Sequence, residues 1–258
     1  MTSPRYVKYC KRSRNPTLGC PTLRIGTLEY YRKLEASEPG IQDPEEGVDR
    51  TVIEEANGAC LPPEAADALG GLRLGPNASV KNCLSISRAT NCFVWCCSLE
   101  DGAGRSAATA FPGCDSSFEF RDPHAMMHWL RDLILGTVTV EHFAPDAQSM
   151  LRSASLRQLA SIELIPTCRR VRYCPNKRTV IRHSEITDDY EQDLPRPVRR
   201  LFVKHSQFAP QREFRFAFFF CHPTFGELAV QHDPLDVPTT PLAPSSALPV
   251  PSPLLGTR

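Results

Sequence analysis

The segment that most limits the fold of this chain is the alternating run EFRFAFFF at residues 213–220. With the two-residue period of a β-strand, the even-numbered positions, all phenylalanine, fall on one face, and Glu213 and Arg215 fall on the other. The aromatic face requires a hydrophobic core packed against it. Ionisable groups on the opposite face are costly unless they are paired or face a cleft. Glu213 is therefore a candidate functional acid, and the alternative is an ordinary Glu–Arg pair at a sheet edge.

Short strand-like runs are scattered along the rest of the sequence, with only two strong helix signals among them. The expected strands are residues 5–10, 22–28, 83–87, 92–98, 117–121, 170–173, 179–182 and 212–221. Regular alternation of strands and helices is absent from this order. The pattern predicts an α+β fold with a mixed, mainly antiparallel sheet, in which 83–87 and 92–98 are neighbouring strands.

The two principal helices are predicted at residues 122–136 and 146–161. Asp122 is a good N-cap because its side chain can accept from the first free backbone N–H groups, and Pro123 suits the first helical position. Apolar residues then recur with helical spacing on one face. This stripe consists of Met126, Met127, Leu130, Leu133 and Ile134.

Residues 1–236 are predicted to form a single domain, and residues 237–258 a disordered tail. Hydrophobic residues make up 41% of the 258 residues, which is enough for a sizeable core. After residue 236 the sequence becomes rich in proline and serine and nearly free of charge. Such a segment cannot bury enough apolar surface to offset its chain entropy.

The chain is expected to be cytoplasmic and to bind no membrane. Its N-terminus has no signal-like apolar stretch, and no run of roughly 18 apolar residues occurs. The 11 cysteines are then expected to stay reduced and to act mainly as small buried hydrophobes. The 30 basic and 29 acidic residues balance, so net charge favours neither nucleic acid nor membrane.

No metal site is expected. Cys92 and Cys96 have the spacing of one zinc-ligand pair, but no second pair follows, and Cys96 and Cys97 would face opposite sides of a strand. His124 and His128 lie four residues apart on the first predicted helix, without the glutamate of an HExxH motif. Buried thiols and surface histidines are the favoured interpretations, with a zinc site as the alternative.

Arginine-rich segments provide an alternative function, that of a non-catalytic module that binds nucleic acid or a protein. The first segment contains Arg169, Arg170, Arg172, Lys177, Arg178 and Arg182, and the second Arg196, Arg199, Arg200 and Lys204. Clustered basic residues attract phosphates, although solvated charged faces give the same pattern.

The sequence contains no Walker or Rossmann glycine motif, so nucleotide binding of those types is not expected. It also lacks the nucleophile-elbow motif GxSxG, so a serine hydrolase is not expected.

Taken in order, several motifs resemble a widespread family of uncharacterised bacterial proteins over residues 5–221. The matching residues are Lys8-Tyr9, Leu23–Thr27, Asp43–Gly47, Cys83-Leu84-Ser85, Trp95, Phe118–Phe120, Lys204 and Glu213-Phe214-Arg215. Two departures occur: residues 96–99 lack the usual aromatic after the tryptophan, and residues 58–75 resemble an insertion.

The same layout is similar to the split sheet of ADP-ribosyltransferases, and this resemblance implies an NAD-consuming enzyme. Lys8 or Tyr9 on the first strand would help to hold NAD, and Arg24 or Thr27 would lie near the nicotinamide. Glu213 would be the catalytic glutamate, because a carboxylate stabilises the cation that develops as nicotinamide leaves. The acceptor would be nucleic acid or protein, and the setting a bacterial toxin or phage defence.

Overall fold

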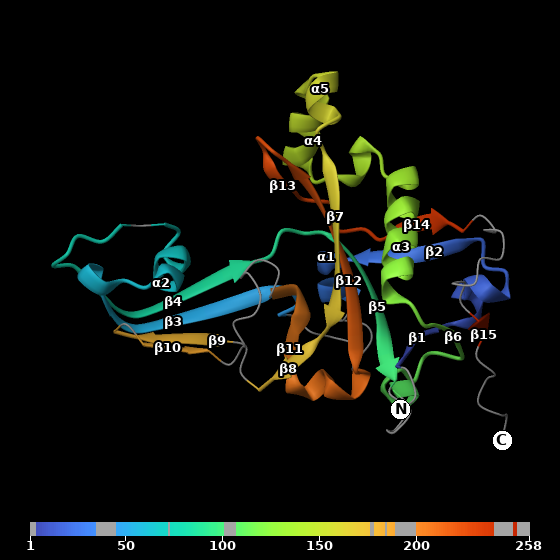
Figure 1. Cartoon of the computed structure of the whole chain (residues 1–258), viewed down its shortest axis with the longest axis horizontal. Helices are drawn as coiled ribbons and strands as arrows, with labels where there is room; N and C mark the ends of the chain where they lie inside the picture. Colours follow the sequence, from blue (N-terminus) through green and yellow to red (C-terminus); the bar gives the residue numbers. More distant parts are fainter. Residues whose placement is uncertain are drawn as a thin grey trace. The chain divides into compact units, whose positions relative to one another are not determined.

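The computed structural model of the chain describes residues 4–34, 45–71, 73–100, 107–175, 178–183, 185–188, 200–239 and 250–251. The predicted α+β class is confirmed, since helices accompany open sheets of mostly antiparallel strands (Figure 1). The sequence predicts one domain, whereas backbone contacts divide the chain into two compact units. Unit 1 comprises residues 1–44, 90–171 and 208–258, and unit 2 comprises residues 45–89 and 172–207.

Unit 1 is organised around the strand β5 (Phe93–Glu100), which pairs along one edge with β12 (Glu213–His222). Its other edge is shared by β1 (Arg5–Cys10) at one end and β2 (Thr22–Thr27) at the other. All further pairings in this sheet are antiparallel. They join β7 (Glu163–Arg170) and β13 (Gly226–Leu228) to β12, β6 (Ser116–Phe120) to β1, β14 (Leu235–Pro238) to β2, and β15 (Val250–Pro251) to β6.

The core of unit 1 covers one face of this sheet, and the predicted alternation of β12 is confirmed. All four even-numbered phenylalanines of β12 belong to the core cluster. Phe216 lies opposite Trp95 of β5, with ring centroids 5.5 Å apart. The helix α3 (Pro123–Thr137) packs against β7 and β14 and adds Met126 and Leu130 to the same cluster (Figure 1). Burial of these large side chains supplies most of the stabilisation of unit 1.

The first predicted helix agrees closely with α3. The Asp122 side chain accepts hydrogen bonds from the backbone N–H groups of His124 and Ala125, at 2.9 and 3.0 Å. The stripe is also confirmed, because its members are either buried in the core or packed against it.

The second predicted helix is wrong as a single element. It is divided into α4 (Pro145–Ser153) and α5 (Leu156–Leu159). Ser155 begins the second helix by a capping box with Gln158, in which each side chain bonds the other residue's backbone N–H. A strong internal N-cap therefore outweighs the continuous apolar pattern.

The remaining helices of unit 1 are short. The α-helix α1 (Leu28–Leu34) follows β2 directly. The 3-10 helices are η1 (Arg12–Arg14), η2 (Pro16–Leu18), η4 (Ala107–Ala110), η5 (Val140–His142) and η7 (Ser206–Gln211), the last of which starts in unit 2.

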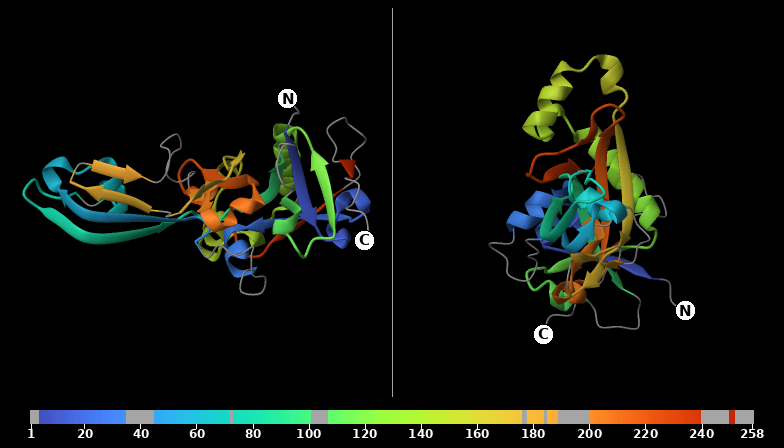
Figure 2. Two further views of the ribbon diagram at one scale, coloured as in Figure 1. Left: turned by 90° about the horizontal axis from the view of Figure 1, so that it is seen from below. Right: turned by 90° about the vertical axis from the view of Figure 1, so that its left-hand side faces the viewer.

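Unit 2 contains a four-stranded sheet in the order β10-β9-β3-β4. Its long strands β3 (Val48–Asn57) and β4 (Ser79–Arg88) run side by side, with β9 (Arg178–Arg182) parallel to β3 and β10 (Glu185–Asp188) beyond it (Figure 2). The other elements are α2 (Pro63–Ala68), η3 (Gly58–Cys60), η6 (Arg200–Phe202), and a parallel pair of β8 (Arg172–Cys174) and β11 (Val203–His205).

Two expectations need correction here. The segments 83–87 and 92–98 are not neighbouring strands, because β4 pairs with β3 in unit 2 and β5 belongs to the sheet of unit 1. The predicted tail also begins too early, because Val237 is fully buried in β14 and Pro238 is paired with Thr22. Residues 240–249 and 252–258 lie outside the described residues, and their disorder stays a prediction. Among the helices that the structure does describe, none has the length and apolar character needed to cross a bilayer.

Replacing Asp122 by alanine tests the cap of α3. We expect the variant to lose about 1 kcal/mol of unfolding free energy, because two backbone N–H groups lose their acceptor. Urea unfolding followed by circular dichroism measures the change. Asp132→Ala, at an exposed position of the same helix, is the control, and an equal loss in both variants would contradict the capping role.

Candidate functional site

Glu213 and Arg215 form a buried ion pair at the beginning of β12. The Arg215 Nε and Nη2 atoms donate to Glu213 Oε1 at 2.8 and 2.6 Å. Glu213 is 5% exposed and Arg215 is 1% exposed. A carboxylate buried without a partner would lose its charge or destabilise the fold, so the guanidinium keeps it ionised in this position.

The pair lies on the sheet face opposite the aromatic core, together with polar groups of β5. Directly opposed residues of antiparallel strands point to the same face. Ser98 lies opposite Glu213, and Cys96 lies opposite Arg215. The Ser98 hydroxyl donates to the backbone carbonyl of Gln211 at 2.8 Å, and both residues are buried. We call this side of the sheet the Glu213 face.

Tyr31 of α1 packs on the Glu213 face against Gly26, and the sequence analysis did not identify it. Burial raises the pKa of its phenol well above the usual value. Electrostatic interactions with Cys96 and Glu213 raise the pKa further, and Arg215 opposes them. The sequence signal that could have revealed it is Gly26, the next-to-last residue of β2 and five residues earlier, since a glycine inside a strand often marks a close approach.

Lys8 and Thr27, two of the predicted cofactor residues, lie on the aromatic face and not with Glu213. In the pairing of β1 with β6, Lys8 lies directly opposite the core residue Phe118 and so points to the same face. Its ammonium lies 4.9 Å from the centre of the Trp95 ring and donates to the Cys96 carbonyl at 2.6 Å. This cation–π contact and hydrogen bond satisfy the charge against the core.

The Thr27 side chain caps the start of α1 and links it to residue 232. It lies opposite the core residue Phe93, and its hydroxyl donates to the His232 carbonyl at 2.7 Å. The same oxygen accepts from the Tyr30 backbone N–H at 3.0 Å, so it caps the helix. Because strand residues alternate between faces, neither Lys8 nor Thr27 can join a site on the Glu213 face.

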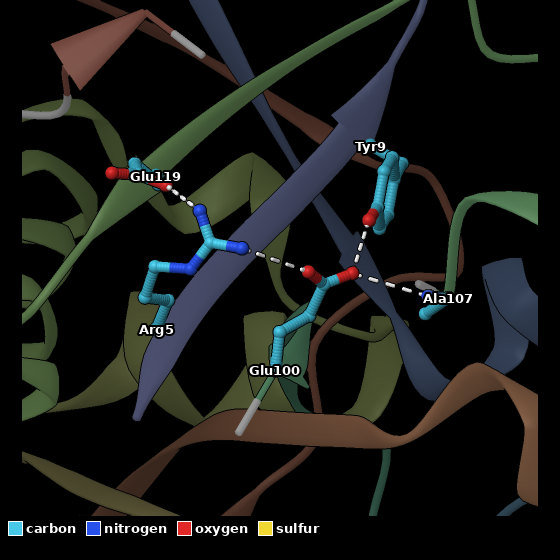
Figure 3. A network of polar contacts seen from close by, with 5 residues as sticks. All are labelled: Arg5, Tyr9, Glu100, Ala107 and Glu119. Carbon is cyan, nitrogen blue, oxygen red and sulfur yellow. Dashed lines mark hydrogen bonds and ion pairs between the residues drawn. The ribbon is translucent and has the colours of Figure 1, made fainter. Parts of the chain in front are cut away.

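Tyr9 lies on the Glu213 face, within a network that surrounds the buried carboxylate of Glu100 (Figure 3). Its hydroxyl and the Ala107 backbone N–H both donate to Glu100 Oε1, the latter at 3.1 Å. Arg5 bridges Glu100 and Glu119, at 3.4 and 3.1 Å. Tyr9 is thus fixed by a second carboxylate on the face that carries Glu213.

Arg24, the remaining predicted cofactor residue, also lies on the Glu213 face but binds a carboxylate of β14. Its Nε and Nη2 donate to the two oxygens of Asp236 at 2.8 and 2.6 Å. The hydrogen bond from Arg24 lowers the pKa of Asp236, and the same bond raises that of Arg24. A ligand anion at Arg24 would have to compete with Asp236.

Unit 2 holds a second buried ion pair, which joins two motifs that are far apart in the sequence. Lys204 Nζ lies 3.3 Å from Glu46 Oε2, and their side chains are 6% and 2% exposed. Glu46 belongs to the motif at residues 43–47 and Lys204 to the closing motif of the family-like pattern. Two pieces of that pattern are thereby brought into direct contact.

The cysteines show no grouping that resembles a metal site within the described parts of the chain. There, no set of three or more His, Cys, Asp or Glu residues could hold a metal ion. Cys96 and Cys97 point to opposite faces of β5, as predicted, and Cys97 packs in the core. Burial raises the pKa values of Cys92 and Cys97, which makes these thiols poor ligands and poor nucleophiles.

Comparison of the chain with models of protein families, with curated proteins and with solved structures finds no match.

The pH dependence of stability tests whether Arg24 is held by Asp236. The ordinary pKa of an aspartate is about 3.9, and that of folded Asp236 is lower. The ion pair therefore stabilises the fold above about pH 4 and loses its effect as pH falls through the folded pKa. We expect Asp236→Asn to melt below wild type at pH 7, with the gap closing toward pH 3.

The measurement is the thermal midpoint as a function of pH, with Asp132→Asn as the control at an exposed carboxylate. A gap between Asp236→Asn and wild type that stays constant down to pH 3 would show that the charge of Asp236 does not stabilise the fold.

Proposed function

We propose that unit 1 binds NAD on the Glu213 face and transfers ADP-ribose to a nucleic acid or protein acceptor. The observation that supports this proposal is the carboxylate of Glu213, which Arg215 holds ionised at the buried start of a core strand. A fixed negative charge in a water-poor environment stabilises a developing cation more strongly than water does.

The proposed reaction places positive charge on the ribose. The bond between the ribose C1′ atom and the nicotinamide nitrogen breaks, and its electron pair leaves with nicotinamide, which becomes neutral. The ribose then carries the positive charge, next to the Glu213 carboxylate. A nucleophilic oxygen or nitrogen of the acceptor attacks C1′ and releases a proton, which completes the transfer.

On this proposal, Tyr9 and Arg24 remain candidate contacts for NAD because they share the Glu213 face, whereas Lys8 and Thr27 are left out. Arg24 is already bidentate to Asp236, so it would act through its outer edge or after exchange of partners. The resemblance to bacterial proteins extends the proposal to a cytoplasmic effector of a toxin or a phage-defence system.

Glu213→Gln tests the reaction directly. Release of nicotinamide from NAD, measured by liquid chromatography with an RNA or protein acceptor present, should fall by about 10²–10³-fold, because the amide keeps the shape but not the charge. Glu163→Gln, at the exposed start of β7, should release nicotinamide as wild type does. If wild type releases none, or if both variants release it equally, the transferase proposal fails.

A second candidate function is non-catalytic binding of nucleic acid, favoured by the exposed side chains of Arg169 and Arg170 at the end of β7. Arg172 follows after one residue. Arg169 lies opposite Arg215 and Arg170 lies opposite Phe214, so the two side chains leave the strand on opposite faces. Exposed guanidinium groups attract a phosphate backbone in a salt-dependent manner.

Joint replacement of Arg169, Arg170 and Arg172 by glutamine tests this candidate. Affinity for labelled single-stranded RNA should decrease, and the slope of log K against log salt should become less steep by about 2 to 3. Anisotropy titrations between about 50 and 200 mM salt provide the slope. The control replaces Arg131, Arg152 and Arg157 of α3–α5 by glutamine, which removes the same charge. This control should keep the wild-type affinity and the wild-type salt slope. Binding that does not depend on salt would contradict this function.

A further inference from the structure

The strand β4 forms a free edge of the four-stranded sheet of unit 2 (Figure 2). It is ten residues long and pairs with β3 on one side. No strand in the part of the chain that the structure describes pairs with its other side. Backbone N–H and C=O groups that point away from β3 between Cys83 and Ser87 are therefore open to a further strand.

The features that normally protect a sheet edge from association lie at the beginning of β4. Lys81 carries a charge, and Asn82 has a φ of +52°, which interrupts the regular strand. Residues 83–87 contain neither a charge nor a proline. Leu84 and Ile86 are nevertheless 56% and 54% exposed. The second half of β4 is thus an unprotected edge with two large aliphatic side chains.

Leu84 and Ile86 belong to the exposed face of this sheet. They lie opposite Val52 and Arg50 of β3, and directly opposed residues share a face. The other face is covered by α2, where the Ser85 hydroxyl donates to a carbonyl of that helix at 2.6 Å. A partner at the β4 edge would therefore meet the two aliphatic side chains, and their removal from water would stabilise the contact.

An antiparallel pairing of β4 with β4 of a second copy is self-complementary when Ser85 is at its centre. Leu84 then lies opposite Ile86 of the second copy, and the reverse pair forms on the other side of the centre. Arg88 approaches Asn82 of the second copy, which carries no charge. Centring the pair on either neighbour of Ser85 would instead place an aliphatic side chain opposite an amide or a guanidinium.

We propose that the β4 edge is a homodimer interface, in which two copies of the chain pair their β4 strands about a two-fold axis at Ser85. Each copy presents the same surface to the other, as a closed two-fold contact requires. The pairing satisfies the backbone groups of the edge and buries Leu84 against Ile86 at two equivalent places. A slip of one residue would set Lys81 opposite Arg88, so repulsion also favours this register. The interface does not depend on the proposed function of unit 1.

Leu84→Glu tests the interface through the molar mass of the full chain in solution. Sedimentation velocity over about a hundredfold range of concentration should show wild type passing from one chain to two. The variant should have a dimer dissociation constant about tenfold or more above wild type, because the symmetric contact contains each change twice. Leu135→Glu, at a leucine of α3 that is 48% exposed, is the matched control and should dimerise as wild type does.

Ile86→Lys tests the register. Alone, it should weaken the dimer as Leu84→Glu does. In the double variant with both changes, each introduced glutamate lies opposite an introduced lysine of the other copy. The double variant should therefore dimerise about threefold or more tightly than either single variant. A pairing centred on residue 84 or 86 would instead oppose like charges.

Circular dichroism and thermal melting check that the variants fold, which is expected because both positions are exposed. Wild type that stays monomeric over the whole concentration range would overturn the proposal. A dimer that neither single change weakens would do the same, because its interface would lie elsewhere. A double variant that associates no better than the single variants would refute the pairing centred on Ser85.

Discussion

The pairing of β12 with β5 is the interaction on which the rest of unit 1 depends. It places Phe216 against Trp95 on one face and Arg215 against Cys96 on the other. A shift of one residue in this register would turn the phenylalanines toward the polar face and put Glu213 and Arg215 into the aromatic core. The cost of burying an ionised pair among aromatic rings makes that register strongly unfavourable. The same contacts that build the core therefore also determine where the acid is presented.

Features that depend on local periodicity could be predicted from the sequence, and features that depend on partner choice could not. The alternation at 213–220 and the cap at Asp122 are local signals, and both are confirmed. Partner choice is different, because the pattern of 83–87 identifies a strand without saying which strand lies beside it. The β-forming residues of 83–87 and 92–98 predicted neighbouring strands, but β4 pairs with β3 from Val48 to Asn57.

The candidate site shows the same division between local and long-range information. Glu213 and Arg215 are two residues apart on one strand, so their shared face follows from the sequence alone. The faces of Lys8 and Tyr9 could not be predicted, since adjacent strand residues point in opposite directions and only the full sheet shows which side is the core. Charge is a poor guide here, because Lys8 faces the core and is satisfied by the Trp95 ring and a carbonyl. Tyr31 lies on the Glu213 face by packing on Gly26, and the glycine indicates a close approach without indicating which ring makes it.

The arginine beside Glu213 changes what the carboxylate can do. A buried carboxylate without a partner would take up a proton and become neutral. The Arg215 guanidinium, with contacts of 2.8 and 2.6 Å to Glu213 Oε1, favours the ionised form. The same guanidinium reduces the attraction that the site has for a cation already present in a ligand. The proposed reaction is compatible with this arrangement, because it needs negative charge only where positive charge develops on the ribose.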